Sequence, residues 1–297
     1  MPKIATSRPA RRFALGSALV GLLLFTVAAP AGAWSAGNNP PVDTREEALA
    51  AGGRRADGPR SRTVIRQGID VSHWQGRIDW DRIARGNVDF AIIKATEGTW
   101  MVDPWYTRNR TRARRAGILF SAYHYANPSR RAGDAIREAN WFVRKAKLDG
   151  TNLIPALDLE ESGGLRPAQL QRWTLQWLRR VEHRLGVKPM LYTSPGFWSG
   201  QVGNTTRISR AGFDVLWLSH WGTRRPTVPG RRWAGDGWTL WQWTERGRVP
   251  GVSGWVDRNV YSGPKLRFMT IRAVRHDGRP GGETSVRDAR PPRPAPF

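Results

Sequence analysis

The chain of 297 residues has no cysteine and few acidic residues. Without cysteine there can be no disulfide bond, no thiolate metal site and no cysteine nucleophile. Only 24 Asp and Glu stand against 48 Lys and Arg, which gives a formal net charge of +24. Such a balance first suggests nucleic-acid binding, and this hypothesis stays open here. A hydrophobic fraction of 39% with 16 Trp excludes a disordered chain.

Several motifs that carry chemistry are also missing. The chain has no Gly-x-Ser-x-Gly elbow, no phosphate-binding loop and no His-x-Glu-x-x-His pattern. These absences argue against an acyl hydrolase, an NTPase and a metal-dependent hydrolase. We therefore expect no metal ion and no cofactor.

One long apolar run lies near the start of the chain. Phe13 to Ala29 follows four basic residues and precedes Ala31-Gly32-Ala33, a small-x-small cleavage pattern. The alternative, a membrane anchor, needs about 20 apolar residues, and this run is slightly short. We interpret residues 1–33 as a cleaved signal peptide, so we expect a secreted bacterial protein without stable membrane insertion.

Two further segments have the composition of unfolded chain. Residues 34–62 are rich in Ala, Gly, Pro, Asn and Arg without periodicity, and residues 273–297 repeat Pro and Gly. We interpret them as a disordered linker and a disordered tail. The remaining range, 63–272, is expected to form one monomeric domain. It keeps 34 basic and 17 acidic residues, so most of the excess charge, +17, belongs to the folded part.

Within this range, short β-branched or apolar runs alternate with helical patterns. Strands are expected at Val64–Val71, Phe90–Thr96, Leu119–Tyr125, Ile154–Leu159, Pro189–Thr193, Val215–Ser219, Thr239–Thr244 and Trp255–Val260. Helices are expected at Asp79–Arg85, Trp105–Ala116, Asp134–Lys147 and Pro167–Leu185, after which the helices fade. The alternation predicts an α/β fold with a parallel sheet, and eight strands favour an irregular TIM-like barrel. The alternative, an open doubly wound sheet, lacks a Gly-rich phosphate turn.

Acidic side chains gather where a barrel places its chemistry. The active site of a βα barrel lies at the carboxyl ends of the strands. Asp70, Glu97, Asp158 and Glu160 stand at such ends, and Asp257 opens the last strand. Two neighbouring carboxyls separate each other's pKa values, which provides the acid and the anion that glycosidic cleavage needs. The alternative for Asp158 and Glu160 is a solvated strand end or a pair held by arginines.

Aromatic residues accompany the acids and suit the faces of sugar rings. Tyr123, Tyr125, Tyr192, Trp74 and Trp241 are our candidates for substrate binding, with core packing as the alternative for each of them. His124 ends the third strand. We expect it to bind substrate or to form a hydrogen bond to a carboxylate, and the alternative is a structural role.

Six short motifs in order resemble a known family. They are Gly68–Gly76 (GIDVSHWQG), Phe90–Gly98 (FAIIKATEG), Tyr123–Tyr125, Leu157–Glu160 (LDLE), Trp241–Trp243 and Gly254–Asn259. The set resembles glycoside hydrolase family 25, the lysozymes (N-acetylmuramidases) that cut bacterial peptidoglycan, over about residues 67–262. The resemblance implies an irregular (β/α)5β3 barrel.

The resemblance also implies roles for the acids. Glu160 is similar to the proton donor to the leaving sugar oxygen, and Asp158 to the residue that positions the substrate's 2-acetamido group. In that scheme the acetamido oxygen attacks the anomeric carbon and configuration is retained, although inversion has also been argued for the family. Asp70 and Asp257 are similar to carboxylates that orient and stabilise charge. Glu97 is similar to a position near the pocket.

The expected function is cleavage of the β-1,4 bond between N-acetylmuramic acid and N-acetylglucosamine. The alternatives are a catalytically inactive wall-binding relative, a chitinase-like glycosidase and a nucleic-acid binder. Asp70, Asp158 and Glu160 are all present, which counts against an inactive relative. The export signal and the acid-lined site count against nucleic acid. The basic domain is instead expected to dock on peptidoglycan and anionic cell wall, in a manner that salt weakens.

Overall fold

The structure is a computed structural model, and it describes residues 64–277. The predicted signal peptide, the linker and the tail beyond residue 277 lie outside the described residues. Within the described range, no helix is both long and apolar enough to cross a membrane.

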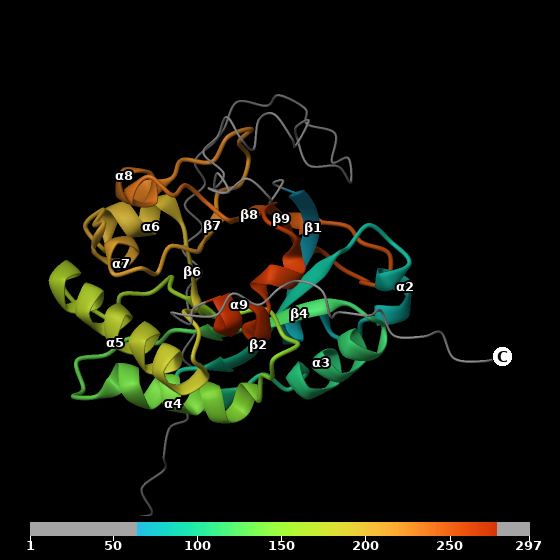
Figure 1. The fold of residues 1–297 in the computed structure, drawn as a ribbon, viewed down its shortest axis with the longest axis horizontal. Coiled ribbons are helices and arrows are strands. Elements are labelled where there is room, and N and C mark those ends of the chain that lie inside the picture. The colour runs from blue at the N-terminus through green and yellow to red at the C-terminus, as the bar shows by residue number, and fades with distance from the viewer. Residues whose placement is uncertain (1–63, 278–297) are drawn as a thin grey trace, which may run out of the picture. The chain divides into compact units, whose positions relative to one another are not determined.

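The strands close into a barrel, as predicted (Figure 1). Their bounds are β1 (Val64–Val71), β2 (Phe90–Glu97), β3 (Met101–Val102), β4 (Leu119–Tyr125), β5 (Ala156–Asp158), β6 (Met190–Thr193), β7 (Leu216–Ser219), β8 (Leu240–Gly247) and β9 (Val256–Gly263). The sheet order is β1-β9-β8-β7-β6-β5-β4-β2-β3, and a further pairing of β1 with β2 closes the ring. Strand β3 forms a hairpin with β2 and is not one of the strands of the closed barrel.

All strands of the closed barrel run in the same direction except the last one, β9. The pairings from β1 through β2, β4, β5, β6 and β7 to β8 are parallel. Strand β9 instead runs antiparallel to both of its neighbours, β8 and β1. The amino end of β9 therefore lies at the same barrel end as the carboxyl ends of the other strands. This brings Asp257 to the end of the barrel that holds Asp70.

Helices α2 to α8 lie outside the ring of strands, whereas α9 lies across one end of the barrel (Figure 1). Their bounds are α2 (Trp80–Ala84), α3 (Tyr106–Arg115), α4 (Asp134–Ala146), α5 (Pro167–Leu185), α6 (Pro195–Gly200), α7 (Arg207–Arg210), α8 (Pro229–Ala234) and α9 (Ile271–Asp277), with 3₁₀ turns η1 (His73–Gln75) and η2 (Leu266–Met269). The four predicted helices are present within two residues of their expected bounds. The sequence patterns missed α6, α7 and α8, because each is too short to show helical periodicity.

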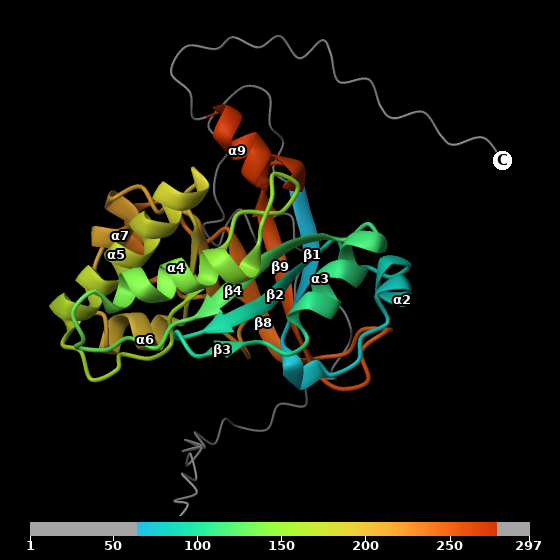
Figure 2. The same cartoon turned by 90° about the horizontal axis from the view of Figure 1, so that it is seen from below.

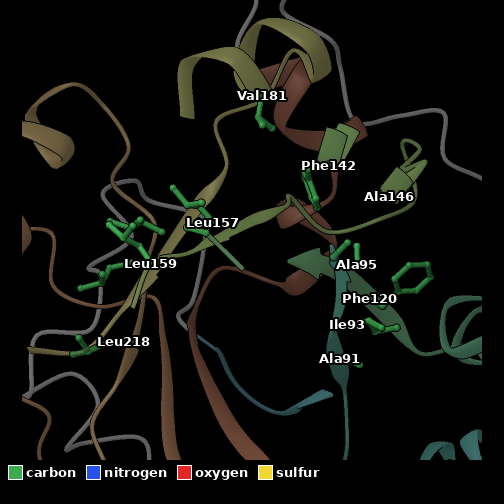
Figure 3. Close-up of a cluster of buried hydrophobic side chains, with 14 of the residues drawn as sticks. Ala91, Ile93, Ala95, Phe120, Phe142, Ala146, Leu157, Leu159, Val181 and Leu218 are labelled. Carbon is green, nitrogen blue, oxygen red and sulfur yellow. The ribbon is translucent and has the colours of Figure 1, made fainter. Parts of the chain in front are cut away.

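Most of the apolar core lies between the barrel and its helices. Alternate residues of β2, namely Ala91, Ile93 and Ala95, are fully buried on the outer face. Figure 3 shows them in one cluster with Phe142 and Ala146 of α4. The other residues of each strand point into the barrel, because successive side chains of a strand face opposite ways.

A second cluster fills the amino end of the barrel. Phe90, Met190 and Leu240, each the first residue of its strand, pack with Met269 and Ile271. Segment η2–α9 thus closes this end of the barrel, away from the η1 turn that follows β1 (Figure 2). The predicted start of the tail at residue 273 is therefore wrong, because α9 continues the folded domain to Asp277.

Candidate active site

The carboxyl end of the barrel carries a polar interior above the apolar cluster. On successive strands, polar and aromatic side chains point into the barrel. In the sequence, these residues alternate with the apolar residues of the outer face. They are Asp70, Lys94, Tyr123, Tyr125, Asp158, Tyr192, Trp217, Gln242, Asp257 and Asn259. Of the predicted catalytic residues, Asp70, Asp158 and Asp257 belong to this set, and Glu160 follows two residues after the end of β5.

Asp70 and Asp257 face each other across the antiparallel β1–β9 pair, where their Cα atoms are register partners. Their carboxyls form a hydrogen bond. Burial raises the pKa of Asp70 to about 6, against the hydrogen bonds that it accepts. Burial, followed by the negative charge of Asp70, raises the pKa of Asp257 to about 9. The pair therefore shares one proton at neutral pH.

Two side-chain amides fix the orientation of Asp70. Its Oδ2 accepts a hydrogen bond from Gln242 Nε2 at 2.8 Å and another from Asn259 Nδ2, also at 2.8 Å. The amide orientations are fixed in turn by two indoles. Trp221 Nε1 donates to Gln242 Oε1 at 3.0 Å, and Trp217 Nε1 donates to Asn259 Oδ1 at 2.7 Å. An indole N–H can only donate, so each amide must turn its oxygen to the indole and its NH₂ to Asp70.

Asp158 and Glu160 form the second acidic pair. Asp158 is buried, and burial together with the charge of Glu160 raises its pKa well above the usual range. Its Oδ1 is buried without a hydrogen-bond partner among the described residues. The side chain of Glu160 reaches solvent, yet crowding by surrounding protein desolvates its carboxyl and raises its pKa. The two carboxyls are hydrogen-bonded, and this bond raises the pKa of Asp158 and lowers that of Glu160, so Asp158 donates and Glu160 accepts in the free protein.

Lys94 places a positive charge among these acids. Its Nζ donates to Glu97 Oε2 at 2.7 Å and lies 4.7 Å from the centre of the Tyr125 ring. The same charge lowers the pKa of Asp158 against the effect of burial. Tyr125 OH donates to Glu161 Oε1 at 3.0 Å. Glu97 is therefore held by Lys94 at the rim of the site.

The predicted aromatics separate into three groups. Tyr123 and Tyr192 line the barrel interior, where both rings contact Trp217. Tyr192 OH also donates to Gln242 Oε1 at 3.0 Å. Trp74 lies on the η1 turn with 81% of its surface exposed. Trp241, in contrast, points outward into the core and donates to the carbonyl oxygen of His220 at 2.8 Å.

The structure does not bring His124 to the site. Its ring is fully buried on the outer face of β4, where it stacks on Trp177. Nε2 lies 2.8 Å from Glu138 Oε2 and Nδ1 lies 2.8 Å from Thr96 Oγ1. Glu138 can only accept while ionised, so Nε2 carries the hydrogen and Nδ1 accepts from Thr96. The expected hydrogen bond to a carboxylate is thus present, but it lies within the core, which fits the structural alternative.

No group of three or more His, Asp or Glu side chains in residues 64–277 is arranged to hold a metal ion. This end of the barrel carries two carboxyl pairs, Asp70 with Asp257 and Asp158 with Glu160, and burial raises the pKa of all four carboxyls. Such pairs serve acid catalysis and the stabilisation of positive charge.

Comparison with known proteins identifies the family. The family model of glycosyl hydrolases family 25 matches residues 69–252. The chain belongs to glycosyl hydrolases family 25. It is thus a glycoside hydrolase, and the predicted family, barrel fold and enzyme class are confirmed.

Relatives of this family 25 enzyme are similar over most of their length. Lysozyme M1 of Streptomyces globisporus is 37% identical over 77% of this chain and 79% of its own. The N,O-diacetylmuramidase of Chalaropsis sp. is 30% identical over 67% of this chain and 98% of its own. The crystal structure of a bacterial lysozyme from Streptomyces coelicolor superposes with a TM-score of 0.64 at 35% identity, covering 71% of this chain and 97% of that one.

Three site residues of the family 25 enzyme escaped the sequence prediction: Lys94, Gln242 and Asn259. Strand alternation carried a usable signal for two of them. Gln242 lies between Trp241 and Trp243, so it faces opposite to both indoles. Asn259 lies two residues after Asp257 and so shares its face. Lys94 lay inside a run that reads as a buried strand, where a lysine needs a nearby carboxylate.

Proposed function

We propose that this chain is an exported N-acetylmuramidase that hydrolyses the β-1,4 bond between N-acetylmuramic acid and N-acetylglucosamine of peptidoglycan. The family membership supports glycoside hydrolysis. The names of the relatives, lysozyme and N,O-diacetylmuramidase, support the substrate. The apolar run and cleavage pattern at residues 13–33 support export.

Glu160 protonates the leaving sugar oxygen. The observation that carries this assignment is the desolvated, hydrogen-bonded Asp158–Glu160 pair, because burial raises the pKa of both carboxyls. Asp158 is buried in the barrel, whereas the side chain of Glu160 reaches solvent. Glu160 is therefore the member of the pair that a bound glycan can touch. General acid catalysis of this kind contributes roughly 10²- to 10⁴-fold to a rate.

Asp158 orients the 2-acetamido group of the substrate. Its Oδ1 is buried and has no hydrogen-bond partner among the described residues, which is costly for a buried polar atom unless a ligand supplies one. An acetamido N–H is such a donor, and its binding favours the ionised form of Asp158, so that the proton of the pair passes to Glu160. When this N–H is held, its carbonyl oxygen can attack the anomeric carbon as the leaving oxygen receives the proton from Glu160. Water then displaces the acetamido oxygen from the anomeric carbon, and the two displacements together retain the configuration. ¹H NMR of fresh digests should therefore detect the β-anomer first, and initial α-anomer would contradict this route.

Asp70 supplies the negative charge that the developing oxocarbenium-like centre needs. Its pKa of about 6 leaves it ionised at neutral pH, and the two amides keep its Oδ2 as an acceptor. Asp257 holds the proton of that pair and so remains neutral. A single net charge in each carboxyl pair avoids repulsion between four acids at one barrel end.

The experiment is digestion of purified peptidoglycan by the wild type and by Glu160→Gln, with mass spectrometry of the borohydride-reduced products. We expect muramic acid at the reducing ends from the wild type and a loss of at least about 10²-fold in Glu160→Gln. Glu161→Gln is the matched control, because it removes the neighbouring exposed carboxyl. Release by Glu160→Gln at the wild-type rate would remove Glu160 as the acid. Equal cleavage of chitin oligomers would favour the chitinase-like alternative.

A further inference from the structure

Helix α3 concentrates positive charge without an obvious structural reason. Its ten residues include five arginines and no acidic residue. Two like-charge pairs, Arg108 with Arg112 and Arg110 with Arg114, lie one turn apart and destabilise the helix. The arginines of the last turn gain from the helix dipole, but Arg108 lies near the other end and does not. Stability alone therefore does not account for this helix.

A surface groove of about 830 Å³ lies between α3 and the second half of α4. Six cationic side chains and no carboxylate line it. The lining residues are Val102, Thr107, Arg110, Thr111, Arg114, Arg115, Trp141, Arg144, Lys145 and Lys147. We call this feature the α3–α4 groove.

Two of the six cations hold the walls of the groove together. Arg110 donates to the carbonyl oxygens of Ala146 and Lys147, at 3.0 and 2.9 Å. Arg114 forms an ion pair with Asp149 at 2.7 Å. These contacts join α3 to the chain that leaves α4, so the groove is a built feature with fixed walls.

The other four cations are Arg115, Arg144, Lys145 and Lys147. All four are exposed, and none has an ion-pair partner within residues 64–277. Arg144 and Lys145 lie over the Trp141 ring, at 5.9 and 4.6 Å from its centre. Trp141 is itself anchored, because its Nε1 donates to the carbonyl oxygen of Met101 at 3.3 Å. The groove thus presents four positive charges without an ion-pair partner among the described residues, on a rigid surface.

We propose that the α3–α4 groove binds the phosphodiester polymer of an anionic cell wall and holds the enzyme on its insoluble substrate. The inference rests on the proposed function, since it assumes an extracellular wall enzyme. A repeating charge matches several free cations in one groove better than an isolated peptide carboxylate does. Arginine also pairs with phosphate through a planar fork of donors. Single-stranded nucleic acid would need open aromatic faces for its bases, whereas Trp141 is covered by Arg144 and Lys145.

The groove adjoins the candidate active site without overlapping it. Val102 lines the groove, and its neighbour Met101 is the register partner of Glu97 at the carboxyl end of β2. None of the candidate active-site residues lines the groove. Polymer binding there can therefore be removed without touching the catalytic carboxyls.

The test compares two variants that each lose four positive charges. The groove variant combines Arg115→Gln, Arg144→Gln, Lys145→Gln and Lys147→Asn. Asn is chosen at position 147 because Lys147 has a left-handed backbone, with φ of 48°, which Asn tolerates. The control variant combines Arg172→Gln, Arg179→Gln, Arg184→Gln and Arg210→Gln, four exposed arginines on α5 and α7.

The probe is soluble poly(glycerol phosphate), titrated by calorimetry at low and moderate salt. We expect the groove variant to bind at least about tenfold more weakly than the wild type, with a flatter salt dependence. The control variant should lose less than about threefold. Cleavage of soluble, phosphate-free glycan fragments should be unchanged in both variants. Glycan cleavage therefore tests the proposed function separately, because polymer binding does not require catalysis and cleavage of soluble fragments does not require the groove.

Three results would overturn the proposal. Equal losses in the groove and control variants would mean that net charge alone matters. Poly-glutamate binding as tightly per charge as poly(glycerol phosphate) would exclude selectivity for phosphodiesters. Duplex DNA that binds more tightly than the wall polymer, and is lost in the groove variant alone, would make the groove a nucleic-acid site.

Discussion

Asp257 lies directly opposite Asp70 across the β1–β9 pair, and the two carboxyls share a hydrogen bond. This contact depends on the reversed direction of β9, which brings the second residue of one strand beside the penultimate residue of another. The pKa values of about 6 and about 9 follow from burial of two acids at one place. Because of this pair, the free energy of unfolding should depend on pH, in a direction that can be measured.

Asp257→Asn should make the enzyme more stable than the wild type at pH 9. The folded pKa of each aspartate is above the unfolded value of 3.8. The folded wild type thus binds more protons than the unfolded chain between about pH 4 and 9, and its free energy of unfolding falls as pH rises through that window. Asn cannot ionise and still offers Asp70 an N–H, so most of the fall above pH 6 should disappear.

Urea unfolding at pH 5, 7 and 9 measures this effect. Asp81→Asn, at an exposed position of α2, is the matched control and should keep the wild-type slope. A wild-type free energy of unfolding that rises from pH 6 to 9 would contradict the shared proton. If Asp257 were ionised in the folded state at neutral pH, Asp257→Asn would not change the slope of the free energy of unfolding between pH 7 and 9.

Gln242→Glu should shift the acid limb of the activity profile upward. The substitution keeps an acceptor for Tyr192 and Trp221 but replaces the N–H that Asp70 receives. A carboxylate at that position repels the charge of Asp70 and raises its pKa above about 6. We expect the lower pKa of the kcat/KM profile to rise by about one unit, with roughly fivefold lower activity at pH 6.

The control for this shift is Gln176→Glu, which adds the same charge at an exposed position of α5. The profile should be recorded on soluble glycan fragments, so that binding to the wall does not affect it. An unchanged acid limb in Gln242→Glu would mean that ionised Asp70 is not needed for the reaction.

The sequence was sufficient to predict the barrel and its acidic residues, but not which face of every strand points into the barrel. On β5, two leucines alternate with Asp158, so one face is apolar and the other is acidic. Alternation then assigns the inward face directly. All eight barrel strands, the closing β9 among them, could also be located from their apolar runs. The reversed direction of β9 was not available from any local pattern, because it depends on ring closure.

Strands β4 and β8 show why the inward face of some strands was not predicted. Tyr123, His124 and Tyr125 are all amphipathic, so both faces of β4 look alike in sequence. Both faces of a barrel strand are also buried, one by the interior and one by the helices. Hydrophobicity therefore cannot tell which side meets the substrate. The same ambiguity made Trp241, rather than Gln242, the candidate on β8.

His124→Gln should destabilise the protein without changing how it binds substrate. The substitution removes a buried ring that bridges Thr96 and Glu138, and it leaves the Glu138 carboxylate with a poorer partner. Loss of a buried hydrogen bond to a charged group costs about 1–3 kcal/mol in the free energy of unfolding. Urea unfolding should show this loss while KM on soluble glycan fragments remains that of the wild type. A raised KM with unchanged stability would restore His124 as a substrate ligand.

Trp74→Ala should weaken substrate binding at no cost in stability. Trp74 exposes 81% of its surface although it is a large aromatic. Its turn is nonetheless rigid, because Ser72 and Gln75 form a capping box and His73 Nδ1 contacts Asp103 Oδ2 at 2.9 Å. The turn follows Asp70 at the carboxyl end of β1, so the indole is a fixed platform beside the acids.

An exposed platform of this kind stacks on a sugar ring, and its loss should raise KM by about three- to tenfold with kcat little changed. The matched comparison is Trp241→Ala, which removes an indole packed in the core. That variant should lose about 3–5 kcal/mol in the free energy of unfolding. Steady-state kinetics on soluble glycan fragments, with urea unfolding alongside, separates the two effects. Unchanged KM in Trp74→Ala would mean that the glycan does not reach the η1 turn, so binding must then rest on Tyr125 and the other aromatics nearer the acids.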